Sequence, residues 1–192
     1  GNIRDPQLPG GGGGSWGATG GGVVRIDAPD ATLRLFGDVV ADGQNPVDRS
    51  GASGGSVRVR ARRIEGRGGL RANGTASMPG INRPGGGGGR VSVSWAEPSM
   101  LAVQLDASGA RSLFGVQDPF SPPAGAGTVF LERLDASGQA LDRGTLRISN
   151  RPSTYPPALT PLPGLGSGTV TAVDPMTGVL TVLAPAATAS IA

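Results

Sequence analysis

The sequence predicts an all-β fold, a glycine-rich right-handed parallel β-helix (β-solenoid) in which short strands wind into stacked coils. The first observation behind this prediction is glycine followed by alternating apolar residues, which recurs at 20–28, 54–61, 88–95 and, in a shortened copy, 127–131. Equivalent valines stand at positions 24, 57, 91 and 129, spaced by 33, 34 and 38 residues. Periods of this length are typical of repeat architectures.

The second observation is a further signature, an aliphatic residue followed by alanine, any residue and glycine. It ends segments 39–43, 70–74, 105–109 and, in the shortened copy, 134–138. Glycine permits sharp turns because it adopts positive φ at little steric cost. The two signatures together predict that each repeat forms one coil and that stacked coils bury their apolar positions against each other.

Each repeat holds about three strand candidates, which in the first repeat are 23–27, 32–35 and 38–41. Val24, Ile26 and Ala28 alternate with charged residues, the period of two that is expected of a strand with one buried face. The same alignment places Trp95 at an inward position. A β-sandwich is the alternative fold, because its antiparallel strands give a similar alternation.

Glycine-rich stretches connect the strand candidates, and residues 1–19 are expected to form a lead-in loop. The stretches 10–14 and 85–89 are predicted to project from one edge and to pack together as extended polyglycine. The chain is thereby divided into repeats over 1–150, a proline-rich linker over 151–167 and a hairpin over 168–192. The prolines of 151–167 have no backbone N–H to donate to a central sheet, so this segment is expected to be a linker between the repeats and the hairpin.

The predicted hairpin is also a candidate for strand exchange or docking, because an isolated hairpin is only marginally stable in water. Two apolar runs flank the turn sequence 174–178. The apolar side chains expected to take part in assembly are Val170, Val173, Val179, Leu180 and Val182.

The composition excludes several classes of site. The 192 residues include no histidine, cysteine or lysine, so the 17 basic residues are all arginine. Ser-His and Cys-His catalysis and the lysine of a P-loop are therefore impossible, and the sequence predicts no enzyme activity, cofactor or metal. The net charge of +3 is too small to indicate nucleic-acid binding, and no apolar run is long enough to predict a membrane span.

The densest charge cluster is a candidate site for an anionic polymer, because the arginine fork matches carboxylate, sulfate and phosphate groups. It consists of Arg58, Arg60, Arg62 and Arg63, the first three on one strand face. The alternative is a ladder of opposite charges between neighbouring repeats. Alignment on the valines would pair Asp27 with Arg60, Asp30 with Arg63 and Glu97 beyond it, and Arg71 with Asp106.

Two exposed aromatic residues, Trp16 and Tyr155, are candidates for stacking on sugars, whereas Trp95 is expected in the core. Some polysaccharide-cleaving β-helices use only carboxylates and arginine, groups that Asp38, Asp42, Glu65 and Arg67 could supply. Ordinary surface charges are the alternative interpretation, since sequence spacing does not show the separation of two carboxylates.

The chain resembles the glycine-rich parallel β-helix repeats of large bacterial surface proteins and adhesins over roughly residues 10–140. The resemblance is carried by 20–26, 41–43, 54–59, 72–74 and 85–93. It implies an extracellular or cell-surface scaffold, fibre or phage tail part. We therefore expect a structural module that self-assembles as a homo-oligomer or filament. The alternatives are a polysaccharide-binding or polysaccharide-cleaving domain and a phage tail or adhesin fragment.

Overall fold

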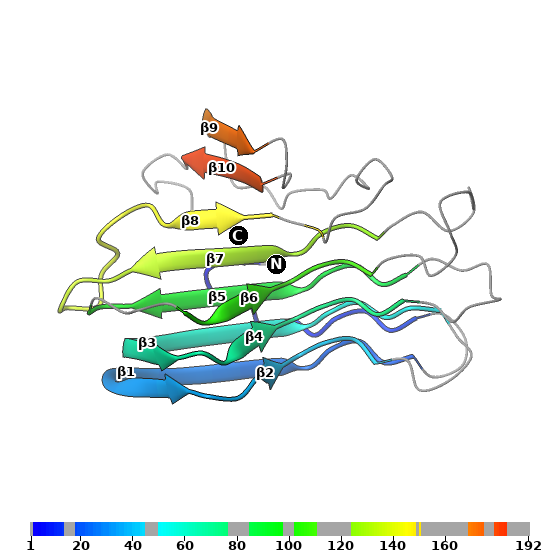
Figure 1. Ribbon diagram of the computed structural model, residues 1–192, viewed down its shortest axis with the longest axis horizontal. Helices are drawn as coiled ribbons and strands as arrows, with labels where there is room; N and C mark the ends of the chain where they lie inside the picture. The colour runs from blue at the N-terminus through cyan, green and yellow to red at the C-terminus, as the bar shows by residue number, and fades with distance from the viewer. Residues whose placement is uncertain are drawn as a thin grey trace.

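The structure of the protein is a computed structural model (Figure 1). It describes residues 2–13, 18–44, 50–76, 85–97, 102–110, 124–148, 150, 169–174 and 179–183, the last two segments by their backbone alone. All regular secondary structure in these segments is β-strand. The predicted all-β class is therefore confirmed.

The main sheet is built from strands that lie far apart in sequence but side by side in space (Figure 1). In order, its strands are β1 (Val23–Leu35), β3 (Ser56–Gly66), β5 (Arg90–Trp95), β7 (Thr128–Arg133) and β8 (Thr145–Arg147). The first four are mutually parallel, and β8 is antiparallel to β7. The parallel pairing differs from the antiparallel strands of the sandwich alternative.

A second, smaller sheet contains one strand from each of the first three repeats, which we define as residues 20–44, 53–76 and 86–110. Its strands are β2 (Val39–Val40), β4 (Gly69–Arg71) and β6 (Gln104–Asp106), all parallel. The antiparallel hairpin of β9 (Thr169–Asp174) and β10 (Val179–Leu183) forms a third sheet. Figure 1 shows β10 beside β8.

The register of the main sheet follows the predicted repeat. Val24 lies opposite Val57, Val57 opposite Val91, and Val91 opposite Val129. The strand candidates 23–27 and 32–35 both belong to β1, whose pairing with β3 shifts register between Ala28 and Thr32. Figure 1 shows the β1 ribbon bending back at this end. The sequence pattern therefore predicted the register but not the continuity of the strand through the bend.

The core forms from the inward positions of both parallel sheets. Val57, Val59, Val91 and Val93 of the main sheet are at most 1% exposed, and Leu70 of the second sheet packs in the same cluster. Trp95 joins this cluster, as predicted. Burial of these side chains supplies the main driving force, because each fully buried valine or leucine contributes about 1.5–3 kcal/mol.

The two repeated signatures meet at the glycine-rich end of the sheets. A Cβ atom on Gly54 would overlap the carbonyl oxygen of Ala72, and one on Gly88 would overlap that of Ala107. The Ala72 carbonyl also accepts a hydrogen bond from Gly89 of the next repeat (N to O, 2.7 Å). Glycine is required here because the two layers approach until backbone touches backbone.

The variable residue inside each alanine-x-glycine signature links consecutive repeats. The Asp42 carboxylate accepts a hydrogen bond from the Asn73 backbone N–H (2.6 Å), and the Asn73 side-chain oxygen accepts one from the Ser108 N–H (2.8 Å). Short polar side chains are favoured at such positions because they bond to neighbouring backbone groups.

Over their described residues, the polyglycine stretches are hydrogen-bonded to other glycine-rich segments of the chain. Gly10 N–H donates to the Gly21 carbonyl (2.9 Å), Gly54 N–H to that of Gly87 (2.9 Å), and Gly88 N–H to that of Gly125 (3.0 Å). These bonds satisfy backbone groups that would otherwise be buried without partners.

The shortened fourth copy departs from the repeat. Its second signature, 134–138, forms a turn directly after β7 instead of adding a strand to the second sheet. The Asp135 carboxylate accepts hydrogen bonds from the N–H groups of Ser137 and Gln139, both at 2.8 Å. This side chain closes the turn and sends the chain back toward β8.

Candidate functional site

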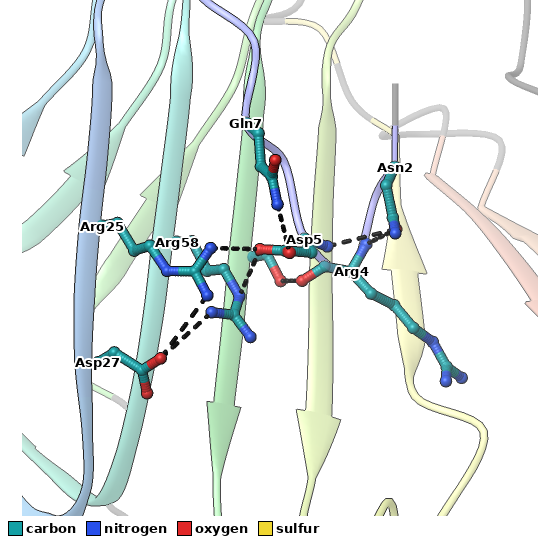
Figure 2. A network of polar contacts seen from close by, with 8 residues as sticks. Asn2, Arg4, Asp5, Gln7, Arg25, Asp27 and Arg58 are labelled. Atoms are coloured by element: carbon teal, nitrogen blue, oxygen red, sulfur yellow. Dashed lines mark hydrogen bonds and ion pairs between the residues drawn. The ribbon is translucent and has the colours of Figure 1, made fainter. Parts of the chain in front are cut away.

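The predicted lead-in loop covers the outer face of the main sheet (Figure 2). The Ser56 hydroxyl of β3 donates to the Leu8 carbonyl (2.6 Å), and the Ser92 hydroxyl of β5 donates to the Arg4 carbonyl (2.8 Å). Ile3 packs with Phe130 and Leu146 in a small apolar cluster. Sequence reasoning missed this cover, for which the outward serines of the adjacent strands β3 and β5 are a signal.

Asp5 of this segment neutralises the first part of the arginine cluster. Its Oδ1 accepts a hydrogen bond from Arg25 Nη1 (3.0 Å) and lies 3.1 Å from Arg58 Nε in an ion pair without hydrogen-bond alignment. Asp27 Oδ2 lies within 3.7 Å of both guanidinium groups (Figure 2). The Arg58 side chain is only 13% exposed, so it is held inside a charge network.

Arg60 lies in a cross-strand row with Ser94 and Glu132. Its Nη2 donates to the Gly138 carbonyl (3.3 Å), while its buried Nε has no hydrogen-bond partner among the described residues. Burial raises the pKa of Glu132, and the guanidinium of Arg4, 3.4 Å from its Oε1, acts in the opposite direction. Cations and carboxylates therefore alternate over this face.

Arg62 and Arg63 follow at the bend of β3, where each has a carboxylate partner. Arg62 Nε lies 3.3 Å from Glu97 Oε1, and Arg63 Nε lies 2.9 Å from Glu65 Oε1. All four arginines of the cluster are thus in contact with oxygen acceptors of the chain itself. Their binding to an anionic polymer stays a prediction.

The predicted charge ladder has the correct register in two places and the wrong register in one, while the ion pairs join Asp27 to Arg25 and Arg58, and Arg71 to Asp38. Asp27 lies opposite Arg60, and Arg71 lies opposite Asp106. The prediction for Asp30 and Arg63 is wrong because β1 has extra residues at its bend, so that Thr32 takes the place opposite Arg63. Glu97 pairs with Arg62.

A pocket of about 420 Å³ opens beyond Arg60, between the bend of the main sheet and the turn after β7. Arg62 and Glu97 line one side, and Asp135 and Ser137 line the other. The hydrogen bond from the Ser137 hydroxyl, together with those from backbone N–H groups, lowers the pKa of Asp135. The pocket therefore presents both charge signs.

The remaining candidates do not gather into one site within the described residues. Asp38 forms an ion pair with Arg71 (3.4 Å), and Asp42 accepts a hydrogen bond from the next repeat. Glu65 forms ion pairs with two arginines. Arg67 is exposed. No group of three or more acidic side chains in the described segments is arranged to hold a metal ion.

Some predicted residues cannot be placed by side chain. Trp16, Tyr155 and the linker 151–167 lie outside the described residues. In the hairpin, the backbone register sets Leu180 opposite Val173 and Val182 opposite Val170, with Val179 opposite Asp174.

The open edge of β1 is the most distinctive surface of the described structure. Ser56 N–H of β3 donates to the Gly22 carbonyl, so alternate residues from Gly22 onward face β3. The backbone groups of Val23, Arg25 and Asp27 therefore point to the free edge. No described strand lies beyond β1, the outermost strand in Figure 1.

Apolar side chains are also exposed in this first repeat. Val23 is 43% exposed, Val40 44% and Phe36 80%. At the opposite end, β7 is paired with β8, and β10 lies beyond it. Scattered apolar residues are normal on a surface, but several in the repeat that carries an unpaired edge make this end a candidate interaction surface.

Comparison with protein-family models, with curated proteins and with solved structures finds no match for the chain. Across the described segments, the structure contains no helix of the length and apolar character needed to cross a membrane.

Proposed function

We propose that the chain is a short parallel β-helix that serves as a structural module of a bacterial cell-surface or extracellular assembly. Its first coil would be completed by a strand from another chain. The observation that carries this proposal is the free edge of β1, where the backbone groups of Val23, Arg25 and Asp27 have no partner among the described residues.

The chemistry of this edge favours strand addition. Exposed edges pair with other strands unless they are short, covered or blocked, and added strands bind through main-chain hydrogen bonds. β1 is long, and its inward residues Val24 and Ile26 are only partly buried against the core. A partner strand would bury them further and so gain hydrophobic as well as hydrogen-bond energy.

The C-terminal hairpin would supply a second contact. It lies beside β8 of its own chain, and exchange of the same element between copies would give a larger assembly without any new type of contact. This is the fibre or multimer that the repeat resemblance implies.

The proposal can be tested by sedimentation velocity and negative-stain electron microscopy over a concentration series. The full chain is compared with Asp27→Pro, which removes a donor that points to the free edge, and with a truncation after Asn150. We expect the full chain to assemble and Asp27→Pro to remain monomeric while folded by circular dichroism. A full chain that stays monomeric at the highest concentration would contradict the proposal.

A second candidate function, polysaccharide binding, is favoured by the pocket beside Arg60 and Arg62. Its mixed charges and hydrogen-bond donors suit a polyhydroxylated or acidic sugar. A glycan array probed with the wild-type chain and Arg62→Ala tests it, with Arg34→Ala as a control that removes an exposed arginine elsewhere. Binding that is absent, or equal in the two variants, would rule out this pocket.

A further inference from the structure

The free edge of β1 carries a charge pattern that is complementary to itself. Arg25 and Asp27 both face the outer side of the sheet, separated by the inward residue Ile26. Their backbone groups also point to the free edge, as derived above. Reversing the direction of the strand about Ile26 exchanges the positions of the two charges.

We propose that the partner of this edge is a second copy of the chain, whose β1 pairs antiparallel with β1 about a two-fold axis at Ile26. This inference rests on the proposed function and names the partner. In this register Arg25 lies opposite Asp27 of the second copy, and Val24 lies opposite Ala28. Charges thus meet opposite charges on the outer face, and apolar side chains meet apolar side chains inside.

Other registers are less favourable for stated reasons. If one β1 strand slides by one residue along the other, inward residues lie opposite outward ones and the buried layer is broken. If it slides by two residues, either Arg25 lies opposite Arg25 of the second copy or Asp27 lies opposite Asp27 of the second copy. Like charges directly opposite each other are destabilising. A two-fold axis parallel to the strands would invert the second sheet, so that its apolar face would lie on the same side as the charged outer face of the first.

Pro29 limits the extent of the pairing. It begins the irregular stretch between Ala28 and Thr32, where the regular pairing of β1 with β3 ends, and it has no N–H to donate. In the proposed register it lies opposite Val23, at the end of the paired segment. An edge closed by proline on both sides favours a discrete dimer over an unlimited sheet.

The sharpest test uses single cysteines, because the chain contains none of its own. Ile26→Cys places two sulfur atoms across a non-hydrogen-bonded pair, whose Cα atoms are about 4.5 Å apart and within disulfide range. We expect most of this variant to form a disulfide-linked dimer under mild oxidation. Val24→Cys, two residues away on the same face, should give little, whereas a mixture of Val24→Cys with Ala28→Cys should crosslink.

A charge exchange gives an independent readout in solution. Arg25→Asp and Asp27→Arg should each weaken self-association by about tenfold or more, because two like-charge pairs replace two opposite-charge pairs. Mixed together, the two variants should associate with each other, since every pair is then complementary. Circular dichroism of each variant verifies that loss of association is not loss of folding.

The outcomes separate this inference from the proposed function. Assembly of the wild-type chain without preferential crosslinking at Ile26 would overturn the two-fold dimer and leave the structural role standing. Equal crosslinking of Ile26→Cys and Val24→Cys would overturn the register. A wild-type chain that is monomeric at all concentrations, with no crosslinking, would overturn both.

Discussion

The first and second repeats have the same sequence pattern but opposite surroundings. Gly22 and Gly55 stand at equivalent positions, yet a Cβ atom on Gly22 would meet open space, whereas one on Gly55 would overlap the Gly22 carbonyl. Along β1, exposed and half-buried residues alternate, while the inward valines of β3 are fully buried. The difference shows that the place of a repeat in the stack, and not its own residues, decides how much each position contributes to stability.

The largest expected effect comes from adding one methyl group at the two equivalent glycines. Gly55→Ala should lower the free energy of unfolding by about 3 kcal/mol, because backbone atoms cannot move aside as a side chain can. Gly22→Ala should instead leave it unchanged or raise it by about 0.4–1 kcal/mol through a less flexible unfolded state. Urea denaturation of both variants measures the difference, and equal losses would contradict the comparison.

Shortening the equivalent valines should give a smaller contrast in the same direction. Val57→Ala is expected to cost about 2 kcal/mol, because Val57 is completely buried and loses the contacts of two methyl groups. Val24→Ala should cost about half as much, since Val24 is only partly buried. Both are measured by urea denaturation at a concentration where the chain is monomeric. A larger loss for Val24→Ala would show that the first repeat is covered in solution.

The N-terminal cover is expected to contribute about 1–2 kcal/mol through Asp5. Asp5→Ala leaves the nearly buried Arg58 with Asp27 as its remaining carboxylate partner. Arg34→Ala is the control, because the ion pair of Arg34 with Glu65 is exposed and should matter by less than about 0.5 kcal/mol. Thermal unfolding of the two variants compares them. Equal melting temperatures would mean that the segment 2–8 does not hold the face closed.

The smallest expected effect is a pH dependence from Glu132. Its pKa is raised in the folded state by burial, so folding is favoured while the group is protonated and loses that advantage as the pH rises through the folded pKa. Glu132→Gln should therefore match the wild type at acidic pH and become relatively more stable toward neutral pH. Urea denaturation across this range tests the sign. A relative loss of stability at neutral pH would show that the attraction of Arg4 outweighs burial.

The glycine and valine spacing predicted much of the fold because the repeat is nearly one-dimensional. When each repeat contacts mainly its neighbours, aligning Val24, Val57 and Val91 in sequence also aligns them in space. The prediction was wrong where this local order breaks. The extra residues at the bend of β1 moved Thr32 opposite Arg63. The shortened fourth copy also leaves the repeat, because its second signature forms the Asp135 turn.

The candidate site was less predictable, because it depends on contacts between distant parts of the chain. The cluster of Arg58, Arg60, Arg62 and Arg63 was visible in sequence, but Asp5 lies far from it along the chain and reaches it only after folding. Likewise, the pocket beyond Arg60 requires the turn after β7 to come back against the bend of β3. Spacing carries no information on such contacts.

The sequence by itself determined the strand class, the repeat, the register and the inward face, because each follows from local alternation and a constant period. Only the tertiary structure decided which repeat is exposed, which arginines are neutralised and why the glycines must be glycine. These properties depend on what lies next to a residue in space. Gly22 and Gly55 cannot be distinguished by their place in the repeat, yet only Gly55 has another backbone against it.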